Sequence, residues 1–500
     1  MVGQTKQIGI MKAGGATYRQ LVTMYLSGVT ALSVISLAAA IPLGYKTAVL
    51  YNTFIANELN FKVLNSTIPV WLNMVVIITL LLLPLSNALL PIRSRCKLSV
   101  LQAINFQRTN SLSSIFGGAS RLPYWLQIGF SNAFRNQSGA ILTIFSLMLG
   151  LALFMTSLNL RSSITNTFVL NLKNQKFDFT VSLDKPYPIE RIKSIIKQSS
   201  GIKAAEYWMT GAMRLLKNRG ENPIDLMGFQ DKTQLLRFNV IAGKIPDSWT
   251  ENIVVNPVFI ADNHLAVGDS VTSSINGKPK IWHIAAVVKD LGEAKAYTSR
   301  SILEQLYNVK DVTSEIKIQT NREMQQADAQ SLLLDVENTL KKNGVGIAGS
   351  TNQGIVMQIL NAHIMVITLF LMVMALLVLI VGGIGLITIM NINILERKRE
   401  IGIMRAIGGS AASINKVLFA ELFMLGVISW LLGWAISLPM SKIISSFFGE
   451  LIIHNELDFS AAPSGIWISL AAVILILILS AIIPIRNASK IAVHTALTDN

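Results

Sequence analysis

Residues Glu396 to Ser410 read ERKREIGIMRAIGGS and lie between two long apolar runs. Wound as a helix, this stretch places the basic Arg405 opposite an apolar arc formed by Ile401, Ile403, Met404 and Ile407. A short, basic, amphipathic helix between two membrane spans suits a cytoplasmic surface, where it can dock against another protein. From these residues alone, an interfacial helix that only anchors the two spans is an equally good interpretation.

A second copy of this stretch favours the docking helix. Residues 6–15, KQIGIMKAGG, align with residues 399–408, REIGIMRAIG. PIRSRCKLSVLQAI from Pro91 aligns with PIRNASKIAVHTAL from Pro484, and both alignments have the same offset of 393 residues (399 − 6 and 484 − 91). Two separated matches at one offset indicate a duplicated unit, in which residues 1–107 correspond to residues 394–500.

The composition is that of a polytopic membrane protein. Hydrophobic residues make up 51% of the chain and charged residues only 14%, and the mean hydropathy is +0.50. A helix that crosses a bilayer needs roughly 20 apolar residues. Six runs of that kind lie at about 21–43, 68–90, 139–158, 362–390, 417–439 and 465–484.

The net charge of +15 does not require a nucleic-acid partner. Of this excess, +13 falls in residues 1–20, 91–138, 391–416 and 485–500. In a six-span topology these four segments lie on one side of the membrane, and an excess of Lys and Arg marks the cytoplasmic side. We therefore place these loops and both termini in the cytoplasm, and we predict no binding to nucleic acid.

The sequence between the third and fourth spans is typical of a soluble domain of roughly two hundred residues. Alternating apolar residues from Phe177 to Leu183 predict a strand, and residues 189–196 have helical spacing. Asn276-Gly277 separates two strand-like runs and predicts a tight hairpin, and residues 322–342 predict a helix. The sequence therefore predicts one external α+β domain.

The chain lacks the patterns that catalytic and cofactor-binding sites require. There is no G-x-x-x-x-G-K-[ST] loop for ATP and no Ser-His-acid or Cys-His arrangement. Cys96 is the only cysteine, which excludes an intrachain disulfide. Metal-ligand spacing is absent from the scattered histidines His264, His283, His363, His454 and His494. We predict that the chain is not an enzyme and binds no metal or cofactor of its own.

Two features inside the spans each allow two interpretations. Gly382, Gly383 and Gly385 in the fourth span favour close helix packing, with a hinge as the alternative. Glu421 lies in the fifth span, where the free-energy cost of placing an acid in the membrane indicates a binding partner or a functional role for it. Because Glu421 is about one helical turn from Val417, snorkelling to the interface is an equal alternative.

Taken together, the repeat, the spans and the external domain resemble the FtsX/MacB-like family of ABC transporter permeases. ERKREIGIMRAIGGS is similar to the cytoplasmic signature that follows the second span in that family. LFAELFMLGVISWLLGWAISLP from Leu418 resembles the third span, with Glu421 at the acidic position, and PIRNASKIAVHTAL resembles the closing segment. RFNVIAGKIPDS from Arg237 and LAVGDSVTSSINGKPKIWHIAAVVKD from Leu265 resemble the MacB-type periplasmic core.

The resemblance implies a permease of the bacterial cytoplasmic (inner) membrane that works with a separate ABC-type ATPase subunit, itself a dimer, which binds the ATP. It implies export or extraction of a peptide, a lipoprotein or a drug-like substrate. The alternative is mechanotransmission or signalling to an extracytoplasmic enzyme. Further expected partners are membrane lipid, a second permease chain or a homodimer, and an extracytoplasmic protein.

The resemblance divides the chain into five parts. Residues 1–107 are the C-terminal part of a first permease unit, with a coupling segment and two spans. Residues 108–138 are a cytoplasmic linker with an interfacial helix, and residues 139–160 are a span. Residues 161–358 form the extracytoplasmic MacB-like core, and residues 359–500 form an FtsX-like permease domain with three spans and the coupling helix.

The residues expected to couple to the ATPase lie in the two copies of the signature. They are Glu396, Arg397, Arg399, Glu400, Ile401, Gly402, Arg405 and Gly408 in the second copy, and Gly9, Lys12 and Gly15 in the first. The first copy has Gln7, Lys12 and Gly28 where the second has Glu400, Arg405 and Glu421. We therefore expect the first copy to couple more weakly, so that two ATPases would not be engaged symmetrically.

The first unit lacks the third span, the external domain and the fourth span, which precede the coupling helix in the second unit. We expect on this basis that the chain is the C-terminal part of a longer permease. The alternative is a six-span form that is completed by association with another chain. The genomic sequence upstream of Met1 decides between these two interpretations.

Overall fold

The computed structural model describes residues 5–58, 60–64, 69–104, 123–133, 137–216, 223–321, 326–453 and 456–489. The chain is divided into two compact units, and each is described by itself. The first unit comprises residues 1–150, 376–432 and 470–500. The second unit comprises residues 151–375 and 433–469.

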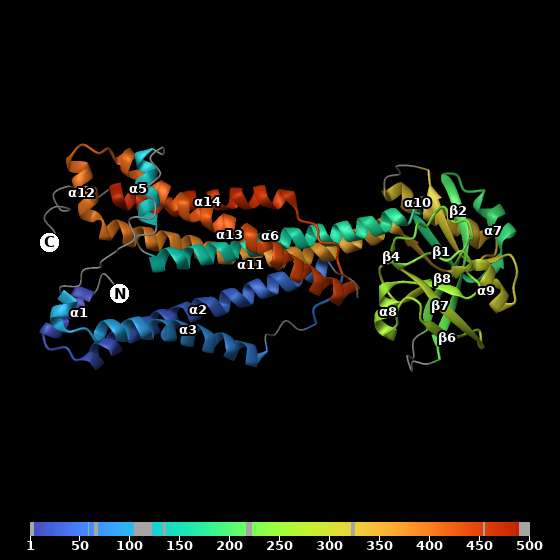
Figure 1. Cartoon of the computed structure of the whole chain (residues 1–500), viewed down its shortest axis with the longest axis horizontal. Helices are drawn as coiled ribbons and strands as arrows, with labels where there is room; N and C mark the ends of the chain where they lie inside the picture. The colour runs from blue at the N-terminus through green and yellow to red at the C-terminus, as the bar shows by residue number, and fades with distance from the viewer. Residues whose placement is uncertain are drawn as a thin grey trace. The chain divides into compact units, whose positions relative to one another are not determined.

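Within the described ranges, six helices are long and apolar enough to cross a membrane. They are α2 (Tyr18–Glu58), α3 (Val70–Cys96), α6 (Gln137–Asn174), α11 (Gln353–Glu396), α13 (Ala411–Ile453) and α14 (Pro463–Ser489), labelled in Figure 1. Each contains most of one of the six predicted runs, so the predicted multi-pass helical fold is confirmed. The shorter helices of this part are α1 (Thr5–Ala13), α4 (Val100–Ile104), α5 (Tyr124–Ala133) and α12 (Lys398–Ala406).

The first span is longer than predicted. The predicted run ends at residue 43, with a loop expected between it and the run from residue 68, but α2 continues to Glu58 with Pro42 inside it. Proline removes one backbone donor, and a membrane helix tolerates this loss where neighbouring groups satisfy the freed carbonyl. The predicted loop is therefore short, and its residues 59 and 65–68 lie outside the described part of the chain.

Between α6 and α11 the chain folds into an α+β domain, which we call the sheet domain. Its ten strands pair in the order β10-β1-β9-β2-β3-β8-β5-β7-β4, and β6 pairs with β2 and β7. The strands are β1 (Phe179–Pro188), β2 (Ile202–Leu215), β3 (Ile224–Phe229), β4 (Val240–Gly243), β5 (Asn252–Val255), β6 (Ser270–Ile275), β7 (Lys278–Val288), β8 (Lys295–Ser299), β9 (Val312–Thr320) and β10 (Ile347–Asn352). The helices are α7 (Ile189–Ile196), α8 (Pro257–Asn263), α9 (Arg300–Tyr307) and α10 (Gln326–Lys342).

Several local predictions for this domain are confirmed. Asn276 and Gly277 have φ angles of +49° and +76°, the left-handed conformations that a two-residue turn between β6 and β7 requires. The helix predicted for residues 322–342 is α10, which ends at Lys342 before Gly344 turns with a φ of +72°. Residues 322–325 of that prediction lie outside the described residues.

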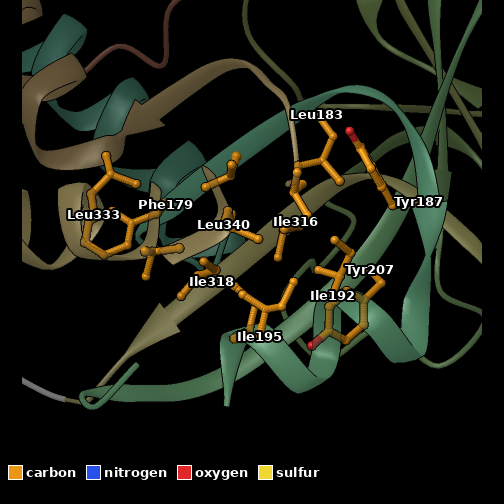
Figure 2. Packing of buried hydrophobic residues seen from close by; sticks show 14 of the residues in the cluster. Phe179, Leu183, Tyr187, Ile192, Ile195, Tyr207, Ile316, Ile318, Leu333 and Leu340 are labelled. Carbon is orange, nitrogen blue, oxygen red and sulfur yellow. The ribbon is translucent and has the colours of Figure 1, made fainter. Parts of the chain in front are cut away.

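One face of β1 and β9 carries the main core of the sheet domain. Phe179 and Val181 of β1 and Ile316 and Ile318 of β9 are fully buried, and they pack against apolar side chains of α7 and α10. Figure 2 shows this packing, with Ile192 and Ile195 of α7 below the strands. Burying each such side chain stabilises the fold by about 1.5–3 kcal/mol. The opposite face of these strands carries polar residues.

Candidate functional site

The turn between α11 and α12 sets the start of the predicted coupling helix. α11 ends at Glu396, and Arg397 leaves the helical conformation with φ −109° and ψ 14°. The amide of Arg397 still donates to the carbonyl of Asn393, which keeps the turn tight. α12 ends before Gly408, whose φ of +95° is the left-handed conformation that glycine adopts without strain.

The apolar arc predicted on α12 is divided between two environments. Ile401 is 1% exposed and Gly402 is also buried, so this side of the helix rests on the chain. Ile403 and Ile407 are 46% and 81% exposed. The four apolar residues of the arc therefore do not share one buried face. Ile403 and Ile407 are exposed, whereas the side of α12 that carries Ile401 and Gly402 packs against the rest of the chain.

Glu421 of α13 is fully buried and is held by two residues at the end of α11. Asn393 Nδ2 donates to Glu421 Oε1 at 2.5 Å, and Arg397 Nη1 donates to Glu421 Oε2 at 3.4 Å. Arg397 Nε also donates to Glu400 Oε2 at 3.0 Å. Arg397 thus joins a carboxylate of α13 to a carboxylate of α12. We call Asn393, Arg397, Glu400 and Glu421 the charge cluster.

The charge cluster favours one of the two interpretations of Glu421. A snorkelling acid would extend to solvent, whereas Glu421 is 0% exposed and paired. α5 covers this position closely, because a Cβ added at Gly129 would lie 2.6 Å from Ala420 Cβ. A buried carboxylate is tolerated only with a compensating charge, so Glu421 fixes Arg397 and with it the start of α12.

The glycines of α11 lie at close helix contacts. A Cβ added at Gly382 would lie 2.7 Å from Leu147 Cδ2 of α6, and one at Gly383 would lie 3.2 Å from Ile476 Cγ2 of α14. α11 is also continuous from Gln353 to Glu396. These contacts support the packing interpretation rather than the hinge.

The first copy of the coupling segment repeats the burial pattern of the second. Ile8 and Gly9 of α1 are buried, like their equivalents in α12, and Ile10 is 58% exposed. Gly15 ends the segment with a φ of +92°, close to the +95° of Gly408. The duplicated sequence therefore forms duplicated local structure.

The contacts that hold the two copies in place differ. Lys12 Nζ donates to the carbonyl of Leu98 at 2.6 Å. Gly28 stands where the second copy has Glu421, so the described residues of the first copy hold no counterpart of the charge cluster. Ile8 of α1 instead packs in an apolar cluster with the buried side chains of Leu21, Ile92 and Cys96. The first copy thus rests on apolar packing and one lysine.

A further polar arrangement, in the second unit, was not predicted from the sequence. Asn159, Ser163 and Thr167 follow one another at four-residue spacing along α6. Their side-chain oxygens accept hydrogen bonds of 2.9 Å from the backbone amides of Ala462, Ser460 and Asp458, respectively. These amides belong to alternate residues of the segment 456–462, which precedes α14 and which we call the strap.

The strap is also joined to the sheet domain and, through α6, to α13. Lys289, which follows β7, forms an ion pair with Asp458, with 2.5 Å between Nζ and Oδ1. Asn159 Nδ2 donates to Ser441 Oγ of α13 at 3.0 Å, and both residues are buried. Side chains of α6, α13 and the sheet domain therefore meet around the strap.

The signal for this arrangement is present in the sequence. Asn159, Ser163 and Thr167 form an N-x-x-x-S-x-x-x-T pattern, which places three polar groups on one face of a helix. The predicted apolar run ended at Leu158, one residue before the pattern begins, and Ser163 and Thr167 were assigned to the external domain. Following the helical periodicity past the last strongly apolar residue would have found them.

Both copies of the coupling segment match one protein family. The model of the FtsX-like permease C-terminal family matches residues 1–100 and residues 372–493. Each range contains one coupling segment and the two spans after it, as the internal repeat predicts. Two separate regions of the chain are therefore similar to the FtsX-like permease family.

Curated relatives align with part of this chain. A probable export ATP-binding/permease protein of Pseudomonas fluorescens (strain Pf0-1) is 32% identical over 152 residues, which are 30% of the chain and 22% of the relative. The macrolide export ATP-binding/permease protein MacB of Chromobacterium violaceum is 32% identical over 125 residues, which are 25% of the chain and 18% of the relative. The aligned part of the chain thus spans about a fifth of these relatives.

Two solved structures are similar to part of the chain. The extracellular domain of the noncanonic ABC-type transporter YknZ from Gram-positive bacteria matches at 13% identity, over 34% of this chain and 99% of that chain, with a TM-score of 0.25. The periplasmic region of MacB from Actinobacillus actinomycetemcomitans matches at 12% identity, over 39% of this chain and 97% of that chain, with a TM-score of 0.26.

The remaining predicted coupling residues of the second copy lie on the outer side of α12 or at its ends. Glu396 and Arg399 are exposed, and Arg405 is half-buried. The structure therefore separates the predicted set into residues that hold α12, chiefly Arg397 and Ile401, and residues that surround its exposed isoleucines.

Proposed function

We propose that this chain is the permease subunit of an ABC-type complex in a bacterial cytoplasmic membrane. A separate ATPase subunit binds and hydrolyses ATP, and the permease uses the resulting movement to export or extract a peptide, a lipoprotein or a drug-like substrate. The names of the aligned relatives, which combine an ATP-binding part with a permease part, support this assignment.

The observation that carries the proposal is the exposure of Ile403 and Ile407, while the other side of α12 is buried against the rest of the chain. Large apolar side chains exposed next to bases such as Arg399 and Arg405 suit a docking surface for another protein. The charge cluster joins this helix to α13, which runs without a break from Ala411 to Ile453. A displacement of α12 by the ATPase would therefore displace α13.

The strap favours a second candidate function. Because Lys289 and Asp458 connect the strap to the sheet domain, movement of α6 or α13 can deform that domain without any substrate passing through the membrane. A mechanotransmission subunit that controls an extracytoplasmic enzyme would use the same parts. ATPase stimulation by a translocated substrate would support export, and stimulation by an extracytoplasmic protein would support mechanotransmission.

Replacing the exposed isoleucines of α12 and its C-terminal cap, in an Ile403→Ser/Ile407→Ser variant, should weaken binding of the ABC-type ATPase subunit. Each isoleucine buried in the interface contributes about 1.5–3 kcal/mol, so the affinity should fall at least about 10-fold. The measurement is the dissociation constant of the purified permease for the ATPase, together with the rate of ATP hydrolysis in the complex.

The matched control for this prediction is Leu334→Ser, which removes an aliphatic side chain that is 49% exposed on α10 of the sheet domain. The equivalent first-copy variant, Ile10→Ser, measures how far that copy contributes. Wild-type affinity in the double variant of α12 would mean that the helix only anchors two spans.

We further propose that both coupling segments face the cytoplasm and that the sheet domain is extracytoplasmic, as the distribution of basic residues supports. A Lys278→Cys variant, at the turn between β6 and β7, should then react with a membrane-impermeant maleimide in intact cells or spheroplasts. A Leu101→Cys variant, at a side chain that is 72% exposed, should react only after permeabilisation. The native thiol of Cys96 is 0% exposed and cannot report either side, so Cys96→Ala is the background. The reverse labelling pattern would overturn the topology.

A further inference from the structure

The sheet domain has a hollow on the face opposite the core of Figure 2. Its volume is about 390 Å³, within the range of small-molecule sites in proteins. Most lining residues come from six strands that are adjacent in the sheet, from β10 at one end to β8 at the other, and Gln175, Phe177, Leu236 and Gln353 lie outside these strands. The hollow thus lies over the middle of the sheet rather than in a loop.

The lining side chains share one face because they occupy alternate positions of their strands. Lys317 of β9 is opposite Thr180 of β1, and Asp225 of β3 is opposite Lys295 of β8. Hydrogen-bonding groups line much of the hollow, and those without charge include Gln175, Thr180, Ser182, Thr210, Thr351 and Gln353. A ligand in this hollow would therefore meet both hydrogen-bonding groups and charges.

All but one of the charges around the hollow have partners. Lys317 forms an ion pair with Glu315, and their side chains are only 9% and 7% exposed. Lys295 forms an ion pair with Asp290, with 3.5 Å between Nζ and Oδ2. Within the described ranges, the carboxylate of Asp225 forms neither an ion pair nor a hydrogen bond, although it lines the same hollow.

The surroundings of Asp225 disfavour its charge. Asp225 is exposed at the edge of the hollow, and its partial desolvation raises the pKa of this carboxyl above its usual value, as do the nearby Glu293 and Glu315. Lys295 acts in the opposite direction but does not reverse the shift. A cation bound against Asp225 would remove this penalty, because an opposite charge at close range favours the ionised form.

The hollow itself shows how this surface holds an ammonium group. The ammonium of Lys317 pairs with the Glu315 carboxylate and donates to Thr180 Oγ1 at 3.2 Å, and it lies 5.2 Å from the centre of the Trp208 ring. A divalent metal would need more oxygen ligands, and the described residues contain no group of three His, Cys, Asp or Glu that could hold one.

We propose that this hollow binds a ligand that presents a primary ammonium group. The ammonium pairs with Asp225, and the rest of the ligand forms hydrogen bonds with the hydroxyl and carboxamide groups along the strands. The inference concerns equilibrium binding to the sheet domain, and it does not depend on whether an ATPase drives the chain. Its failure would leave the coupling proposal intact, and failure of coupling would leave this site intact.

The test uses the purified full chain in a non-ionic detergent and two fluorescein-labelled tripeptide amides, Gly-Lys-Gly and Gly-norleucine-Gly, with the label on the amino terminus. Fluorescence anisotropy should show binding of the lysine peptide at least about 10-fold tighter than that of the norleucine peptide. An Asp225→Asn variant keeps the shape of the side chain and should abolish this preference.

Two further variants keep the test decisive. Ala212→Lys places an ammonium of the chain itself opposite Asp225, since the two residues pair across β2 and β3, and it should block the lysine peptide without removing the acid. Asp335→Asn, at an exposed position of α10, is the matched control and should bind like the wild type. Equal binding of the two peptides, or an unchanged preference in Asp225→Asn, would overturn the proposal.

Discussion

The Arg397→Met variant should melt at a markedly lower temperature than the wild type, because the buried Glu421 carboxylate loses its ion pair with the Arg397 guanidinium. Removing one partner from a buried ion pair costs about 3–5 kcal/mol, since the remaining charge stays desolvated. Asn393 keeps its hydrogen bond to Glu421 but supplies no charge. The apparent melting temperature of the purified chain in detergent measures the effect, and ATPase stimulation should fall with it because α12 loses its attachment.

A double variant distinguishes the loss of the whole ion pair from the loss of only one of its charges. In Arg397→Met/Glu421→Leu both charges are gone, and apolar residues of similar size often replace a buried pair at little cost. The double variant should therefore regain most of the stability that the single variant loses. Glu400→Gln is the control: its side chain is 49% exposed, and its ion pair with Arg397 is worth about 1 kcal/mol or less. If Arg397→Met melts like the wild type, the charge cluster does not hold α12.

Removing the three acceptors on α6 should release the strap. In an Asn159→Leu/Ser163→Ala/Thr167→Val variant, three amides of the strap lose their partners, and each unsatisfied buried group costs about 1–3 kcal/mol. Hydrogen–deuterium exchange of residues 456–462 should accelerate strongly, and the melting temperature should fall. Exchange reports the strap directly, so it distinguishes local release from a general loss of packing.

Two controls belong to the strap experiment. Ser446→Ala removes an exposed hydroxyl of α13 that only bonds to its own helix, at the carbonyl of Lys442, and should change neither readout. Lys289→Met removes the ion pair to Asp458 but leaves the three acceptors in place. Unchanged exchange in the triple variant would show that the strap is held by other contacts.

Much of the fold could be predicted because local signals and tertiary packing agree. Ile8 and Ile401 are buried in equivalent helices because the same apolar residues recur at the same spacing. Asn276-Gly277 forms the predicted hairpin because few other dipeptides adopt the two left-handed conformations so easily. The length of α2 could not be predicted, since whether Pro42 ends a helix depends on neighbouring groups that the sequence does not place.

The candidate sites were less predictable, because their parts come from distant positions in the chain. The sequence marked Glu421 as costly and Arg397 as part of a signature, but nothing in it paired the two across 24 residues. The strap joins α6 to residues almost three hundred positions later. For Ile403 and Ile407, helical spacing placed them on the apolar arc, while their exposure depends on which side of α12 the chain covers.

The three hydrogen bonds of the strap connect two repeats of slightly different length, so they can form together only over a short distance. Four residues of an α-helix advance about 6.0 Å, whereas two residues of an extended chain advance about 6.6–6.8 Å. The mismatch is roughly 0.7 Å per step, so a fourth position would lie about 2 Å out of step, beyond the tolerance of a hydrogen bond. Asn171 continues the polar pattern of α6, yet the described contacts include no bond from the Glu456 amide to it. The strap thus has one register and a fixed length, and an axial shift of α6 by a fraction of a helical turn would break all three bonds together.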